Sequence, residues 1–181
     1  MMKVNALKSV FAPYRQFSTT QVSKPKVNQL NAGVWFQPHF QKVKKGGEDA
    51  ASLSKNVIAV ADGVGGWADQ GVDPALFSKK LCKNIDSLVY TNEKYITDPK
   101  ALLIEAVSQN MEMGSSTCVI ATLDHYKPLL RTCNLGDSGY MLLRKSGLDL
   151  VQVFRSVEQT HGFNFPYQVG TGGDDPAKGD E

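Results

Sequence analysis

Cysteine is scarce in this sequence of 181 residues, and long apolar runs are missing from it. The three cysteines, Cys82, Cys118 and Cys133, are odd in number and form neither a CxxC pair nor a Cys/His ligand pattern. We therefore interpret them as reduced, mostly buried thiols, which excludes a disulfide framework or a cysteine zinc site. No apolar run approaches the roughly 18 residues that a bilayer-spanning helix needs, so the sequence predicts no transmembrane segment.

Acidic residues are absent from positions 1–47, which contain eight Lys or Arg residues. Wound as a helix, the first 15 residues place their apolar side chains on one face and Lys3 and Lys8 away from it. Such a basic, Ser/Thr-containing, amphipathic segment is typical of an organelle transit peptide, and the stretch after Arg15 resembles a mitochondrial cleavage region. We expect residues 1–25 to be a transit peptide and the protein to reside in mitochondria, most simply the matrix. The alternative is a basic arm that contacts nucleic acid, but targeting explains the segment better, so we expect no nucleic-acid partner.

The remaining composition is that of an ordinary globular protein, with 41% hydrophobic and 21% charged residues. The length favours one domain, which we place at residues 30–169. Residues 170–181 contain no large apolar side chain, and we expect them to form a disordered acidic tail.

An apolar run that ends in a carboxylate and glycines is the most informative stretch, NVIAVADGVGGW at residues 56–67. The run has the length and composition of a buried strand, and Asp62 stands at its exit beside Gly63. A carboxylate next to bare backbone can hold a hard cation, whereas the alternative is a plain turn that the aspartate caps. A preceding strand at 48–53 would pair with 57–62 and bring Glu48 and Asp49 beside Asp62 and Gly63. Because like charges that face each other need a cation or a proton between them, this pairing favours the metal hypothesis.

Two helices and a series of strands are predicted downstream. Asp73-Pro74 and Asp98-Pro99 each supply a helix N-cap followed by proline, and apolar spacing of three and four follows both. We expect these helices to pack antiparallel on one face of a sheet. Short runs at 115–123, 128–135, 138–144 and 148–154 favour an antiparallel meander. Asp137 lies in the turn between the second and third runs, either as a plain hairpin residue or as a second acidic strand exit like Asp62.

Four motifs in a fixed order then point to one family: GGEDA at 46–50, VADGVGGW at 60–67, GSST at 114–117 and NLGDSG at 134–139. The series resembles the metal-dependent type 2C serine/threonine phosphatases (PPM family) from about residue 33 to 175. The flanking segments GVDPALFSKKL and RSVEQTHGFNFPYQVG resemble the mitochondrial branch of that family. The resemblance implies an α+β fold, an αββα sandwich of two antiparallel sheets flanked by helices. It also implies an incomplete C-terminus, because the family's later DG motif and Asp-Asn have no counterpart before Glu181.

The resemblance further implies a site that holds two Mn²⁺ or Mg²⁺ ions. Asp62 matches the carboxylate that bridges both metals, the carbonyl of Gly63 matches a ligand of the second, and Glu48 and Asp49 match the acidic pair beside it. Asp137 matches the acid of a third, weaker metal position. Glu48, Asp49 and Asp62 are accordingly the expected catalytic residues, and carboxylate and carbonyl ligands suit these hard cations.

Two departures from the family pattern affect the expected chemistry. Val64 stands where many members have a histidine proposed as general acid, so protonation of the leaving group must come from water or another residue. Lys44 and Lys45 stand near the place of the family's phosphate-binding arginine. The implied function is hydrolysis of phosphoserine and phosphothreonine in phosphoproteins by a metal-activated water. The alternative is a catalytically inactive type 2C-like module that acts by binding a partner.

Overall fold

The computed structural model describes residues 27–171. The expected transit peptide at 1–25 and most of the expected acidic tail at 170–181 lie outside these residues. Within them, no helix is long and apolar enough to cross a membrane.

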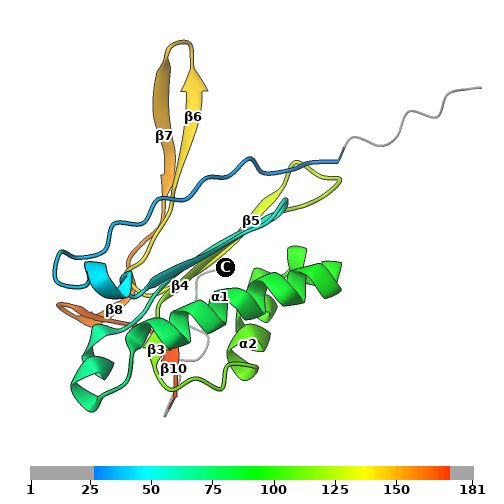
Figure 1. Cartoon of the computed structure of the whole chain (residues 1–181). Coiled ribbons are helices and arrows are strands. Elements are labelled where there is room, and N and C mark those ends of the chain that lie inside the picture. The colour runs from blue at the N-terminus through cyan, green and yellow to red at the C-terminus, as the bar shows by residue number, and fades with distance from the viewer. Residues whose placement is uncertain (1–26, 172–181) are drawn as a thin grey trace, which may run out of the picture.

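One four-stranded antiparallel sheet forms the centre of the fold (Figure 1), in the order β1-β2-β4-β5. Its strands are β1 (Asp49–Leu53), β2 (Val57–Asp62), β4 (Cys118–Leu123) and β5 (Leu130–Leu135). The hairpin that the sequence predicted between 48–53 and 57–62 is therefore confirmed as β1 and β2.

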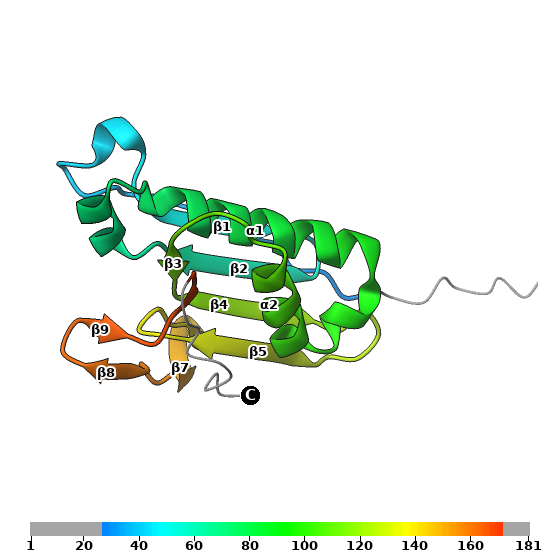
Figure 2. The same ribbon diagram turned by 90° about the horizontal axis from the view of Figure 1, so that it is seen from below.

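Two helices cover one face of this sheet (Figure 2), α1 (Pro74–Thr91) and α2 (Pro99–Ser108). Both begin as predicted, because the side chains of Asp73 and Asp98 accept hydrogen bonds from the N–H groups of the first helical turn. Their antiparallel packing is also confirmed. Asn84 of α1 donates to the carbonyl of Ala106 near the end of α2, and Asn110 just beyond α2 donates to the carbonyl of Phe77 near the start of α1.

The hydrophobic core lies between the sheet and the helices. Along β2, Val57, Ala59 and Ala61 are buried, while the residues that alternate with them are exposed or only partly buried. The same face of β4 contributes fully buried Ile120, and α1 contributes fully buried Leu81. The three cysteines are free and buried, as expected. One face of the sheet is thus closed by helices, and the chemistry described below lies on the other.

The predicted meander is correct for its first pair of strands and wrong for their connection to the next. β5 pairs with β4, but β6 (Met141–Ser146) and β7 (Asp149–Arg155) form a separate hairpin that projects from the sheet (Figure 1). The chain leaves the sheet at Gly136, whose φ of +100° is open to glycine and strained for other residues. That turn directs the backbone away from the sheet, and β6 does not pair with β5.

Short elements complete the described chain. They are the 3₁₀ turns η1 (Val43–Lys45), η2 (Gly65–Gln70) and η3 (Glu93–Ile96) and the strands β3 (Ser115–Ser116), β8 (Thr160–Gly162), β9 (Phe165–Pro166) and β10 (Val169–Gly170). β10 pairs with β3, and the N–H of Thr171 donates to the carbonyl of Gly114 over 2.9 Å. The tail boundary expected at residue 170 therefore falls inside a paired segment.

The expected αββα sandwich is observed in part. Antiparallel sheet and helices are present as layers, but residues 27–171 do not place a second sheet over the open face. Leu53 and Val60 remain exposed on that face, and β7 is exposed along its whole length.

Candidate metal centre

Two carboxylates face each other where β1 begins and β2 ends. The antiparallel register pairs Asp49 directly with Asp62, and the N–H of Gly63 donates to the carbonyl of Glu48 over 3.2 Å. Both aspartates alternate with buried alanines that contribute to the helix-side core, so their carboxylates lie on the open face. The sequence-based expectation that Glu48 and Asp49 lie beside Asp62 and Gly63 is confirmed.

The carboxyl group of Asp62 responds strongly to this environment. Its pKa is raised from 3.8 to about 6, first because partial burial disfavours the charged form. The charge of Asp49 and a hydrogen bond with its carboxyl group add to the rise, and the charges of Asp137 and Glu48 contribute further. All four acids predicted as metal ligands are therefore close enough to interact electrostatically. Without a cation, the cluster favours a proton on Asp62 below about pH 6.

The glycine that follows Asp62 is required by close packing. A Cβ at Gly63 would lie 2.5 Å from the carbonyl oxygen of Pro74 and 2.8 Å from that of Glu48. The end of β2 therefore touches both the start of α1 and the residue before β1. This contact fixes the backbone carbonyl of Gly63 at the same edge of the sheet as the carboxylates.

Residues of the GSST motif hold Asp62 from its other side. The hydroxyl of Ser116 and the N–H of Thr117 both donate to the carbonyl of Asp62, over 2.8 and 3.0 Å. The hydroxyl of Thr117 lies 2.7 Å from that of Ser138, next to Asp137. The sequence analysis used this motif to identify the family but predicted no role for its residues. The structure shows that it connects the two acidic strand exits.

A lysine to which the sequence analysis gave no role contacts the acidic cluster. Lys42 forms an ion pair with Glu48 because Gly46 and Gly47, both with positive φ, reverse the chain between them. Lys44 and Lys45, expected near a phosphate, are exposed on η1. Lys45 joins Lys42 and Glu48 in lining a cavity of about 320 Å³. The paired glycines at 46–47 were the available sequence signal, since two flexible residues before Glu48 permit such a reversal.

The donor chemistry of this cluster fits Mg²⁺ or Mn²⁺, which prefer carboxylate and carbonyl oxygens. The opposition of the Asp49 and Asp62 carboxylates, and the raised pKa of Asp62, show a place where positive charge is favoured. Across residues 27–171, however, no group of three or more His, Cys, Asp or Glu side chains is arranged to hold a metal ion. Within this part of the chain, the residues that fit a divalent cation are thus the Asp49–Asp62 carboxylate pair and the acids near it.

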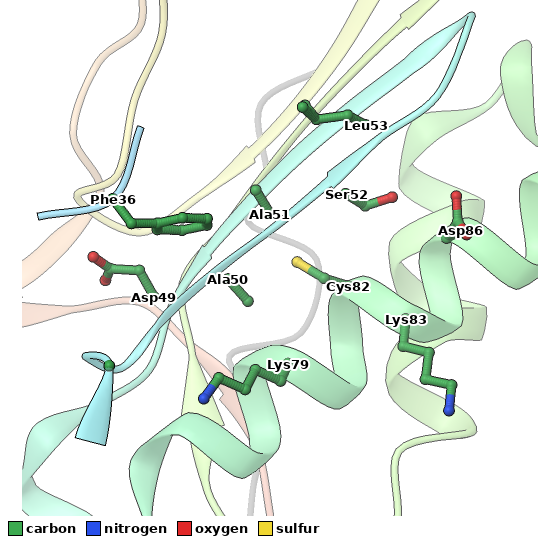
Figure 3. A pocket seen from close by; sticks show the side chains of 11 residues that line it. Phe36, Asp49, Ala50, Ala51, Ser52, Leu53, Lys79, Cys82, Lys83 and Asp86 are labelled. Carbon is green, nitrogen blue, oxygen red and sulfur yellow. The ribbon is translucent and has the colours of Figure 1, made fainter. Parts of the chain in front are cut away.

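A second cavity of about 510 Å³ lies between the outer edge of β1 and α1. Figure 3 shows Asp49 and Phe36 at one side of it and Lys79, Cys82 and Lys83 projecting from α1. Because β1 is the first strand of the sheet, one side of its backbone has no strand partner within the described residues. Asp49 is the residue that this cavity shares with the carboxylate pair.

Comparison with known proteins identifies relatives, although no protein-family model matches the chain. The chain is 41% identical over 160 residues to "Probable protein phosphatase 2C 26" of Arabidopsis thaliana, a match that covers 86% of this chain and 51% of that protein. It is 38% identical over 154 residues to "Protein phosphatase PTC7 homolog" of Homo sapiens, covering 77% of this chain and 49% of the relative. The chain therefore spans about half the length of these curated relatives.

A solved structure agrees with these sequence matches. The chain superimposes on the structure described as "X-ray structure of the photosystem II phosphatase PBCP" with a TM-score of 0.68 and 35% identity. The match covers 80% of this chain and 54% of that one. The recognition made from the four motifs is thus confirmed by both sequence and fold: the chain belongs to the PP2C family of protein phosphatases.

Proposed function

We propose that this chain contributes Glu48, Asp49, Asp62, Gly63 and Asp137 to a Mn²⁺ or Mg²⁺ site of a protein serine/threonine phosphatase. The observation that carries the proposal is the direct opposition of Asp49 and Asp62 at one edge of the sheet. Membership of the PP2C family supplies the reaction class, hydrolysis of phosphoserine and phosphothreonine in phosphoproteins. Divalent cations bound at such a site activate water as a nucleophile and neutralise phosphoryl oxygens.

The chain's own residues have distinct tasks in this proposal. Asp62, whose pKa is raised by partial burial and by the charges of the other three acids, would bridge two cations, with the carbonyl of Gly63 and the acids Glu48 and Asp49 completing one side. Asp137 would hold a third, weaker cation. Ser116 and Thr117 keep the backbone of Asp62 in place through two hydrogen bonds to its carbonyl. The side chain of Val64 has no titratable group, so the leaving-group proton must come from water or another residue.

Phosphate release from a phosphothreonine peptide tests the proposal. We expect the full chain to release phosphate with Mn²⁺ present, and to lose this activity on chelation and in Asp62→Asn. Asp149→Asn, which removes a carboxylate from the projecting β7, serves as the matched control and should retain activity. Activity that persists unchanged in Asp62→Asn under chelation would contradict the metal mechanism.

A second candidate is a non-enzymatic module that binds a partner through the PP2C-like surface. Two observations favour it: the described residues bring no three metal-binding side chains together, and the open sheet face and β7 expose apolar side chains. Such a module would show no phosphate release with or without Mn²⁺, while binding at most one cation weakly.

Location is a separate part of the proposal. The basic, acid-free segment at 1–25 supports delivery to mitochondria, with domain residues 30–169 as the delivered part. A reporter fused to residues 1–25 should co-localise with mitochondria, and a diffuse cytosolic signal would contradict this assignment.

A further inference from the structure

Glu48, in the acidic cluster, has a cationic partner within the described part of the chain. The ammonium group of Lys42 pairs with its Oε2 atom, and both groups lie beside Gly65 of the glycine loop. Only 16% of the Glu48 side chain is exposed, compared with 42% for Lys42. The carboxylate side chain is therefore mostly buried, whereas the lysine reaches it from a more solvent-exposed position.

The ion pair gives Glu48 a different partner from the two aspartates beside it. Asp49 and Asp62 interact with each other across the β1–β2 hairpin, while Glu48 is neutralised by Lys42 on the loop side. A divalent cation that takes Glu48 as a ligand competes with the ammonium group for the same carboxylate oxygens, because both bind there through positive charge.

We propose that Lys42 is an internal counter-cation that holds Glu48 in the metal-free protein and must be displaced when a divalent cation binds. The inference rests on the proposed function, since it requires a cation site that includes Glu48. The displaced ammonium group remains next to the 320 Å³ cavity that Lys42 shares with Lys45 and Glu48. Only the form with unpaired Glu48 accepts the cation. The apparent affinity for the cation is therefore the intrinsic affinity multiplied by the fraction of protein in which Glu48 is unpaired.

Calorimetric titration of the full chain with Mn²⁺ tests this competition. We expect Lys42→Gln to bind Mn²⁺ about threefold more tightly than wild type, in keeping with the modest strength of partly exposed ion pairs. Lys45→Gln is the matched control, because it removes the same charge from the same cavity wall but breaks no ion pair observed between residues 27 and 171. Tightening by Lys42→Gln alone supports the proposal, whereas equal effects of both variants would indicate general electrostatics and overturn it. Unchanged or weaker binding in Lys42→Gln would also overturn it.

Chemical labelling of the wild-type protein provides a test that needs no variant. Reductive methylation followed by peptide mass spectrometry should modify Lys42 slowly without metal and several-fold faster with saturating Mn²⁺, while Lys45 stays unchanged. A Lys42 rate that does not respond to bound Mn²⁺ would overturn the displacement. If calorimetry detects no Mn²⁺ binding to wild type or either variant, the proposed function fails and this inference fails with it. Binding without a specific Lys42 effect defeats only the inference.

Discussion

Asp62 is the acid of the cluster whose pKa the fold shifts most clearly. It terminates a strand, faces a second aspartate, and is held from behind by Ser116 and Thr117. The rise of its pKa to about 6 follows from this position, since folding partly buries the carboxyl group beside other acids. The same features that make the site unfavourable for a lone carboxylate make it favourable for a bound cation.

The metal-free protein should therefore lose stability as the pH rises. Since folding raises the Asp62 pKa from 3.8 to about 6, the folded state holds this proton more tightly than the unfolded state does. The stabilising contribution is complete below about pH 4 and is lost as the pH rises through 6. We expect the free energy of unfolding of wild type to fall relative to that of Asp62→Asn over this range, as measured by urea denaturation in EDTA. A difference between the two proteins that stays constant from pH 4 to 7 would contradict this.

At the scale of elements, the junction of β2 with α1 decides where the carboxylates stand. Gly63 permits the end of β2 to touch the backbone of Pro74, the first residue of α1, and that of Glu48 before β1. The three segments meet at this one position without side chains between them. The site is thus built on the ends of regular elements rather than on a long loop.

Replacing Gly63 by alanine should force this junction apart. The new Cβ would lie within 2.8 Å of two backbone carbonyl oxygens, which cannot move without shifting α1 or β1. We expect a loss of about 1–3 kcal/mol in the free energy of unfolding, the usual cost of overpacking, as measured by chemical denaturation. Gly66→Ala is the matched control, because a Cβ at that position would meet no atom within 4 Å. Equal stability of the two variants would show that the junction is looser than described.

At the scale of the molecule, the core of the described residues 27–171 is one-sided. Helices close one face of the sheet, while the other face and the β6–β7 hairpin expose apolar residues such as Val60 and Val153. The free energy of unfolding should therefore depend mainly on residues on the helix side. Substitutions of exposed apolar residues on the open side should change it little.

Two leucines allow this asymmetry to be measured. Leu81 is fully buried on α1. Replacing it by alanine should lower the free energy of unfolding by about 2–5 kcal/mol, because a cavity remains. Leu148, fully exposed at the tip of the β6–β7 hairpin, should change the free energy of unfolding by no more than about 0.5 kcal/mol when replaced by serine. A large loss in Leu148→Ser, seen as a lowered denaturation midpoint, would mean that the hairpin is packed in solution.

Local signals predicted much of this architecture. Both helix starts were visible as Asp-Pro pairs, and the opposition of Asp49 and Asp62 followed from strand length and the short turn between them. The meander failed after β5 because the direction of the chain beyond Gly136 depends on one backbone angle that no periodicity reports. Lys42 was missed for a similar reason, since its contact with Glu48 depends on how Gly46 and Gly47 turn the chain. Patterns of hydrophobicity predict which face of a helix or strand is buried and which strands pair. They do not predict the direction that the chain takes after a glycine with positive φ.

The central claim is that the Asp49–Asp62 pair binds a divalent cation, and a direct count of bound Mn²⁺ tests it. Free Mn²⁺ gives an electron paramagnetic resonance signal that is lost on binding, so titrating the protein into a fixed Mn²⁺ concentration measures occupancy without any substrate. We predict saturable loss of signal for wild type and for Asp149→Asn, and a much weaker loss for Asp62→Asn and Asp49→Asn. Equal binding by wild type and Asp62→Asn, with both proteins folded, would contradict the claim.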